Sequence, residues 1–308
     1  MTAPAISTPQ HIEHRIKTAD GRTLAVAEWG DPNGVPEIAM HGTPGGRITY
    51  WEDPTIYARH GLRRITYDRP GYGESTRFKG RSVADVVIDV EAITAALGID
   101  RFVVTGGSGG GPHCLATAAL MPDRVIRCLA EVSIAPYPTE GLDWLAGMTE
   151  GNVEEFNAAM EGEEQHRRVA ERERKTTLDR LAQGRADFLG DSYELSDADK
   201  AQFAKHLNRV ADQFFNAWRP ASTAGSTTCS RSSSRGVSRL RRSGSRRPSN
   251  SAERTISCPR HTATGWRRTS QTRSSARVRN RATPGSDADV ELVTAWLAGE
   301  VSDLSRSA

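Results

Sequence analysis

The chain has 308 residues, a hydrophobic content of 37% and a formal net charge of +3 at pH 7, which fits one large α/β domain with an inserted subdomain, or two smaller domains. Residues 1–10 lack the basic and apolar regions of a signal peptide, and no apolar run approaches the ~18 residues that span a membrane. The four cysteines form no CxxC pair, so we expect no zinc site, no disulfide framework and a reducing, cytoplasmic compartment.

The first 140 residues alternate strands and helices. Residues 14–29 are typical of a hairpin, because Asp20-Gly21 favours a tight turn. Ser82, with Asp85 three residues on, resembles the N-cap of a helix whose apolar face continues to Leu97. Further elements are expected as strands at 37–40, 64–67, 101–105 and 125–134, and as a helix at 113–120. This order predicts an α/β core at residues 12–140, with a mostly parallel sheet covered by helices on both faces.

The pattern changes in the second half of the chain. Residues 141–218 are helical in pattern and dense in charge, and we interpret them as a lid inserted over the edge of the sheet, with most charges on a solvated face. Residues 287–301 show helical periodicity again and are expected to form the last helix of the core. Its apolar positions are Val290, Val293, Trp296 and Leu297.

Between these parts lies a segment of unusual composition. Residues 221–286 contain 15 arginines, 16 serines, no lysine and one acid, Glu253, so the rest of the chain is net acidic. With few large apolar residues and mutually repelling charges, the segment cannot offset the entropy of folding. It is therefore predicted to be mostly irregular, and the sheet is predicted to lack its last strands.

The strongest chemical pattern is the Gly-Gly-Ser-Gly-Gly run at residues 106–110, between a predicted strand and a predicted helix. A nucleophile on a sharp strand-to-helix turn needs very small neighbours, here Gly106 and Gly110, because the backbones approach closely. We expect Ser108 at this turn, with the glycines before it in strained conformations. A phosphate-binding loop is disfavoured because no Lys-Ser/Thr follows, whereas Glu131 keeps a dinucleotide site open as a less favoured alternative.

A second pattern lies about 65 residues upstream, where His-Gly-Thr-Pro-Gly at 41–45 follows a strand. The N–H of Thr43 and the N–H of Gly109 are expected to point into one cavity beside the Ser108 Oγ, as an oxyanion hole. An ordinary Pro-Gly turn is the alternative. For His41 we favour a structural role, in which it shapes the loop.

Together these motifs resemble the α/β-hydrolase superfamily, most closely its HGxPG branch of proline iminopeptidase-like enzymes and esterases. The resemblance rests on residues 41–45, on Tyr-Asp-Arg-Pro-Gly-Tyr-Gly-Glu-Ser at 67–75 and on residues 106–110, and it covers about residues 12–218 and the final helix. It implies a helical lid, acyl transfer by Ser108, and a structural loop in which Asp68 and Arg69 have no catalytic role. Epoxide opening and halide removal are disfavoured, because those relatives carry Asp at the nucleophile position.

The rest of the expected triad is missing. A serine needs a general base that a third group orients, and in this fold the acid and then the histidine follow the nucleophile, with the histidine near residue 283. No Asp occurs between Asp212 and Asp287, and His261 is more than 20 residues too early. Residues 221–286 are thus either a basic, disordered, nucleic-acid-binding segment or the product of translation in a shifted frame.

The genetic code favours the shifted frame. In the frame that begins two bases later, each codon combines the last base of one residue's codon with the first two bases of the next residue's codon. Residues 252–259 then permit Gly-Glu-Asp-Asp-x-Met-Pro, 261–267 permit His-Gly-Asp-Trp-Leu-Ala, 269–274 permit Ile-Pro-Asp-Ala-Glu, and 281–283 permit Gly-His. This order resembles the acid loop, penultimate helix, last strand and histidine loop of the family. We infer compensating shifts near Pro220 and near Gly285.

The sequence therefore predicts a serine-type hydrolase that cleaves an ester or amide bond of a small molecule through an acyl-enzyme. Its acid and base are missing from the chain as written, so this polypeptide is expected to be impaired. No metal, cofactor, membrane or nucleic-acid partner is expected. The alternative is a non-catalytic hydrolase-like module with a basic, disordered segment that binds nucleic acid.

Overall fold

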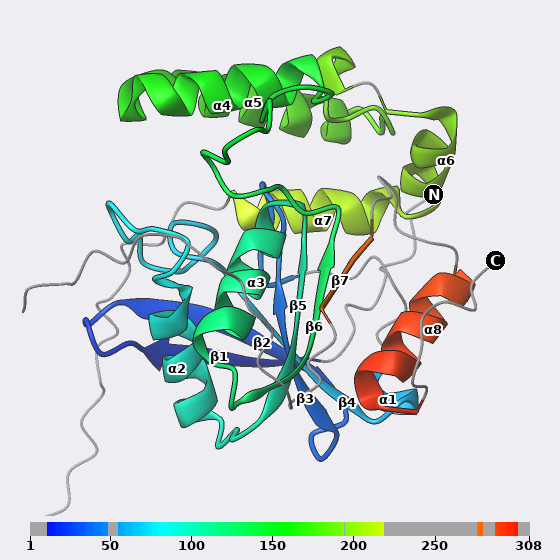
Figure 1. The fold of residues 1–308 in the computed structure, drawn as a ribbon. Helices are drawn as coiled ribbons and strands as arrows, with labels where there is room; N and C mark the ends of the chain where they lie inside the picture. The colour runs from blue at the N-terminus through cyan, green and yellow to red at the C-terminus, as the bar shows by residue number, and fades with distance from the viewer. Residues whose placement is uncertain (1–10, 49–54, 194, 219–275, 280–286, 301–308) are drawn as a thin grey trace, which may run out of the picture. The chain divides into compact units, whose positions relative to one another are not determined.

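The computed structural model describes residues 11–48, 55–193, 195–218, 276–279 and 287–300. Within these ranges seven strands form one sheet in the order β1-β2-β4-β3-β5-β6-β7 (Figure 1). The antiparallel pairs are β1–β2 and β2–β4, and all other neighbours are parallel, which confirms the predicted mostly parallel sheet. The strands are β1 (Ile12–Lys17), β2 (Thr23–Gly30), β3 (Val35–Met40), β4 (Leu62–Tyr67), β5 (Phe102–Gly107), β6 (Val125–Glu131) and β7 (Ala276–Arg279).

Successive side chains of a strand point to opposite faces of a sheet, and each face here carries its own apolar cluster. Val104 packs in one cluster with residues of α2 (Val86–Ala96) and α3 (Gly111–Leu120). Its neighbour Val103 packs in the other, with residues of α1 (Thr55–Arg59) and α8 (Asp287–Ala298). Trp296 and Leu297 of α8 are each only 2% exposed, so the helix that follows the basic segment belongs to the core.

The structure differs from the sequence prediction at several boundaries and in one short helix. The second helix begins at Val86, not at Ser82, because the backbone N–H and the hydroxyl of Ser82 both donate to one carboxylate oxygen of Asp85, at 2.6 and 2.9 Å, and close a turn before the helix. Strand β6 ends at Glu131, since Val132 has a φ of 43° that no strand accommodates. Helix α1 was not predicted, because its five residues are too short to show periodicity.

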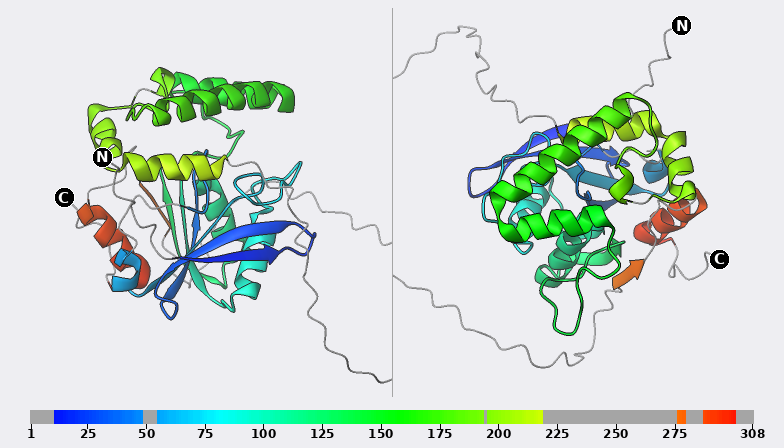
Figure 2. Two further views of the ribbon diagram at one scale, coloured as in Figure 1. Left: turned by 180° about the vertical axis from the view of Figure 1, so that it is seen from behind. Right: turned by 90° about the horizontal axis from the view of Figure 1, so that it is seen from above.

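Residues 141–218, where the structure describes them, contain helices and no strand of the sheet. The helices are α4 (Glu150–Glu161), α5 (Glu163–Ala182), α6 (Asp197–Lys205) and α7 (Leu207–Ala217). Figure 2 shows α4 and α5 running side by side. Three aromatic rings hold the remaining helices together, because Phe188 packs edge-on against Phe203 and Phe214. The carbonyl of Ala217 accepts a 2.9 Å hydrogen bond from the N–H of Gly73, so the end of α7 is tied to the core.

Strand β7 corrects one expectation for residues 221–286. We predicted a mostly irregular segment and a sheet without its last strands, yet the sheet continues beyond β6, because residues 276–279 pair with it in parallel. The open edge of β6 offers backbone groups to any extended segment, and Ala-Arg-Val-Arg alternates as a strand does. The remaining residues of that segment, 221–275 and 280–286, lie outside the described residues. Within the described ranges, no helix has the length and apolarity needed to cross a membrane.

Candidate active site

Ser108 lies where β5 ends and a short 3-10 turn, Ser108–Gly110, leads into α3. Its φ of 50° is in the left-handed region, which few non-glycine residues occupy and which costs on the order of 1 kcal/mol. The strain was expected in the preceding glycines, but Gly107 is extended with a φ of −104°. The chain changes direction at the serine itself, which leaves Ser108 exposed at the carboxyl end of the strand.

The glycines around Ser108 are required by close packing. A Cβ on Gly106 would lie 2.4 Å from the carbonyl oxygen of Gly110, and a Cβ on Gly110 would lie 2.1 Å from the carbonyl oxygen of Met40. Both distances are far inside van der Waals contact. The two glycines therefore allow β3, β5 and the start of α3 to meet at one point.

The loop after β3 lies against this turn. A Cβ on Gly42 would come 3.3 Å from the Cβ of Ser108, and a Cβ on Gly109 would come 2.3 Å from the Oγ1 and 3.2 Å from the backbone nitrogen of Thr43. The structure thus brings Thr43 and Gly109 together beside Ser108, as the oxyanion-hole hypothesis requires.

The guanidinium of Arg69 binds the loop after β3 through three hydrogen bonds. Its Nε donates to the carbonyl of His41 at 3.1 Å, and its Nη2 donates to the carbonyl of Gly42 at 2.9 Å and to the Oγ1 of Thr43 at 2.8 Å. The side chain is 3% exposed, and in the described part of the chain no carboxylate forms an ion pair with it. Asp68, in contrast, is bound by the backbone and guanidinium of Arg47.

Two histidines are near Ser108, and both have their ring nitrogens occupied. In His41, Nδ1 donates to the carbonyl of Gly42 at 2.7 Å and Nε2 accepts from the N–H of Arg69 at 3.0 Å. In His113, Nε2 lies 3.0 Å from the Nη1 of Arg81 and Nδ1 lies 3.0 Å from the carbonyl oxygen of Gly109. Since a guanidinium can only donate, Nε2 of His113 is the acceptor and Nδ1 carries the proton.

Neither histidine is therefore placed to take a proton from Ser108, and among the described residues the Ser108 hydroxyl has no hydrogen-bond partner. The role expected for His41, which shapes its loop, agrees with its two contacts. Sequence analysis missed His113. Its position four residues after Gly109, one helical turn on, was the pattern that could have indicated a side chain reaching back to the Gly109 carbonyl.

Both histidines make the fold sensitive to acid. Burial, with the nearby guanidinium groups of Arg69 and Arg81, lowers the pKa of His113 to about 3, and burial and Arg69 hold the pKa of His41 well below its usual value. A depressed histidine pKa stabilises the fold above about pH 6.5, and this stability is lost as the pH falls toward the folded-state value.

We expect the unfolding free energy of the chain to fall below pH 6.5, by up to about 1.4 kcal/mol per pH unit for each such histidine. His113→Asn keeps a donor near the position of Nδ1 but cannot take up a proton. The unfolding free energy of this variant is therefore expected to fall less steeply as the pH decreases. Urea unfolding at pH 7.5, 6.0 and 5.0 measures both slopes. Equal slopes would show that His113 is already protonated in the folded protein.

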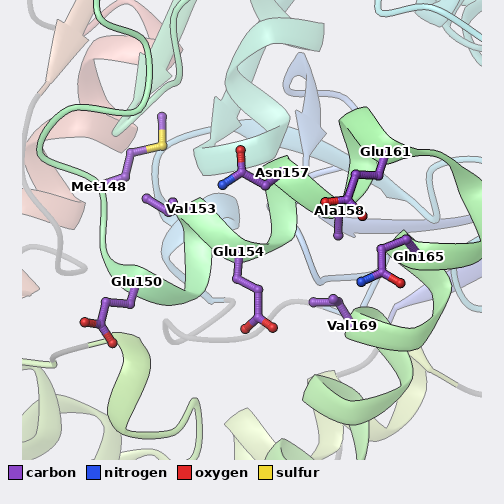
Figure 3. Close-up of a pocket in the computed structure, with 9 residues that line it drawn as sticks. All are labelled: Met148, Glu150, Val153, Glu154, Asn157, Ala158, Glu161, Gln165 and Val169. Atoms are coloured by element: carbon purple, nitrogen blue, oxygen red, sulfur yellow. The ribbon is translucent and has the colours of Figure 1, made fainter.

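Two cavities adjoin the helices of residues 141–218. The first, of about 430 Å³, lies between α4 and α5 (Figure 3), and its lining combines Met148, Val153 and Val169 with acidic and amide side chains. The second, of about 460 Å³, lies between residues 71–77, α5 and the end of α7, with Tyr72 and Trp218 in its lining. Tyr72 packs edge-on against His41, so the second cavity is next to the loop that carries Thr43.

Comparisons with known proteins identify relatives of the chain. Relatives include a proline iminopeptidase from Xanthomonas citri, 35% identical over 111 residues (34% of each chain). Another is a non-heme chloroperoxidase from Streptomyces lividans, 29% identical over 147 residues (47% of this chain and 53% of the relative). The chain thus spans about a third to a half of the length of these relatives.

Among solved structures, an epoxide hydrolase from Vigna radiata is 15% identical, with a TM-score of 0.38 over 51% of this chain and 49% of that one. The sequence model of the alpha/beta hydrolase fold matches residues 38–219, which is more than half of the chain and includes Thr43, Arg69 and Ser108. The chain belongs to the α/β-hydrolase family.

Proposed function

We propose that Ser108 is the nucleophile of a hydrolase that cleaves an ester or amide bond of a small molecule. The observation that carries this proposal is the left-handed backbone of Ser108 at an exposed turn between β5 and α3. A strained non-glycine residue persists only where the surrounding structure holds it, and such residues gather at functional sites. Here the strain presents a hydroxyl beside Thr43 and Gly109.

The chemistry follows from these positions. The Oγ of Ser108 forms a bond to the carbonyl carbon of the substrate, and the carbonyl oxygen takes up the negative charge. The N–H groups of Thr43 and Gly109 bind that oxygen. When the carbonyl re-forms, the alcohol or amine leaves with a proton, and water then releases the acid from the acyl-enzyme. The proline iminopeptidases among the relatives favour an amide substrate.

The proton transfers need a base and an acid, which we place in the shifted reading of residues 221–286. Two observations support this. The histidines near Ser108 are occupied by other partners. In addition, α8 packs Trp296 and Leu297 into the core directly after the segment, as expected if the reading frame returns near Gly285. The polypeptide as written is therefore proposed to keep the nucleophile and to have lost its activation.

Covalent labelling of the full chain tests the nucleophile. A fluorophosphonate ester forms a bond between phosphorus and an activated serine oxygen and releases fluoride and a proton. Without its base Ser108 reacts slowly, so we expect labelling over hours, at Ser108 and at no other serine. Peptide mass spectrometry locates the adduct, and Ser108→Ala is the control. Labelling spread over the serines of residues 221–286 would contradict the proposal and favour a non-catalytic module.

A further inference from the structure

The Thr43 side chain carries a group that the proposed reaction has not yet used. The Oγ1 of Thr43 accepts a hydrogen bond from Nη2 of Arg69 at 2.8 Å. A hydroxyl has one proton to donate besides the lone pairs with which it accepts. Among the described residues no acceptor lies within hydrogen-bond distance of that proton, and Thr43 is exposed. Within the described part of the chain, this donor is therefore unused.

The Thr43 hydroxyl lies beside Gly109. A Cβ built on Gly109 would lie 2.3 Å from the Oγ1 of Thr43, 2.9 Å from its Cβ and 3.2 Å from its nitrogen. The hydroxyl and the backbone N–H of Thr43 thus both lie beside the residue that supplies the other N–H of the site. Gly42, the residue before Thr43, lies close to the nucleophile, since a Cβ built on it would come 3.3 Å from the Cβ of Ser108.

Arg69 places a positive charge next to the Thr43 hydroxyl. Its guanidinium is 3% exposed, and among the described residues it contacts two carbonyls, the Thr43 hydroxyl and the ring of Tyr72, with no carboxylate to neutralise it. A cation that donates to a hydroxyl polarises it and makes its own proton a stronger donor. Such a donor is most effective where negative charge develops.

We propose that the Thr43 hydroxyl is a third donor of the oxyanion hole, oriented and polarised by Arg69. The inference rests on the proposed function of Ser108. It makes Thr43 a catalytic residue through its side chain as well as its backbone, and it makes Arg69 a positioning residue with a use beyond closing the loop. The buried guanidinium would then act on the anion through Thr43 without contact with the substrate.

Butylboronic acid tests this on the chain as it exists. The Oγ of Ser108 adds to boron, a proton goes to the buffer, and the tetrahedral boronate carries one negative charge and two hydroxyls, one of which occupies the oxyanion position. Boron NMR detects the tetrahedral species without a need for turnover. Titration at several pH values gives its dissociation constant and the pH at which half of the protein carries the adduct.

A matched pair of variants isolates the hydroxyl. Thr43→Val keeps the shape and the backbone N–H but has no hydroxyl, whereas Thr43→Ser keeps the hydroxyl. We expect Thr43→Val to weaken the adduct by about 10- to 100-fold and to raise its pH midpoint, by analogy with the loss of one oxyanion-hole donor. Thr43→Ser is expected to stay within about threefold of the unsubstituted chain. Thermal unfolding of both variants checks that the loop remains folded.

The outcomes separate this inference from the function on which it rests. If both variants bind as the unsubstituted chain does, the hydroxyl is not a donor, and Ser108 remains the nucleophile. If the unsubstituted chain forms no boronate adduct, or forms one that persists in Ser108→Ala, the proposed function fails and the inference with it. The role of Arg69 is tested by Arg69→Lys, whose effect on the pH midpoint is expected to disappear in the Thr43→Val background. If Arg69→Lys still shifts the pH midpoint in the Thr43→Val background, the role of Arg69 is structural alone.

Discussion

Restoring the two-base-shifted reading between codons ~220 and ~285 is expected to raise kcat/KM for a short-chain ester by at least about 10³-fold over the chain as written. Removal of a triad member commonly costs several orders of magnitude, and what remains is catalysis by the oxyanion hole and by binding. The restored chain would regain both the acid and the histidine. The rate gain therefore measures how much activation Ser108 has lost.

The same pair of proteins provides the controls. Ser108→Ala in the restored chain is expected to return the rate to near the level of the chain as written, because a base without its nucleophile contributes little. The restored chain is also expected to unfold more cooperatively, since residues compatible with strands and a helix replace an arginine-rich segment. A restored chain no faster than the original would contradict the assignment of the acid and the histidine.

The second large effect is on stability, and it is expected to differ between two glycines of the turn at Ser108. Gly110→Ala places a Cβ 2.1 Å from the carbonyl oxygen of Met40, so β3 and the start of α3 must move apart. We expect this substitution to destabilise the fold by roughly 3 kcal/mol or more. Gly107→Ala is the matched control, because its φ of −104° suits any residue and its Cβ would have no atom within 4 Å. Its effect is expected to stay below about 1 kcal/mol.

Chemical denaturation of the two variants beside the parent chain measures this difference. A loss of stability in Gly110→Ala alone would support the close approach of β3 to the turn. Equal stability of all three proteins would mean that the backbone around Ser108 is looser than the structure indicates. Equal losses in both variants would instead point to a general need for flexibility at the turn.

Much of the fold could be predicted because its elements repeat simple patterns. The hairpin of β1 and β2 was indicated by Asp20-Gly21 between two alternating runs, and α2 was indicated by apolar residues at helical spacing, such as Val86, Val90 and Ile93. The turn at Ser108 was predicted from the glycines around it, since few other residues allow such close backbone contact. These features depend on neighbours in the sequence.

The parts that could not be predicted depend on contacts between distant residues. Arg69 was assigned a structural role because nothing in the sequence shows that its guanidinium lies under the loop of Thr43, 26 positions away. The strain at Ser108 was assigned to the wrong residue, because glycine composition indicates a tight turn and does not show which φ is positive. Strand β7 was missed because four alternating residues within an arginine-rich segment are too few to indicate a strand, and the pairing depends on the edge of β6, which is distant in the sequence.

One measurement tests the central claim most directly, namely that Ser108 is the nucleophile of a triad whose other members are encoded in a shifted frame. It is the nucleotide sequence of the gene from codon 215 to codon 290. The claim predicts that the frame two bases on is open and encodes an Asp-containing loop near codons 253–256 and Gly-His near codons 281–283, with a compensating insertion or deletion at each end. A stop codon in that frame, or no Asp and His at these places, would contradict it and leave residues 221–286 as a genuine basic segment.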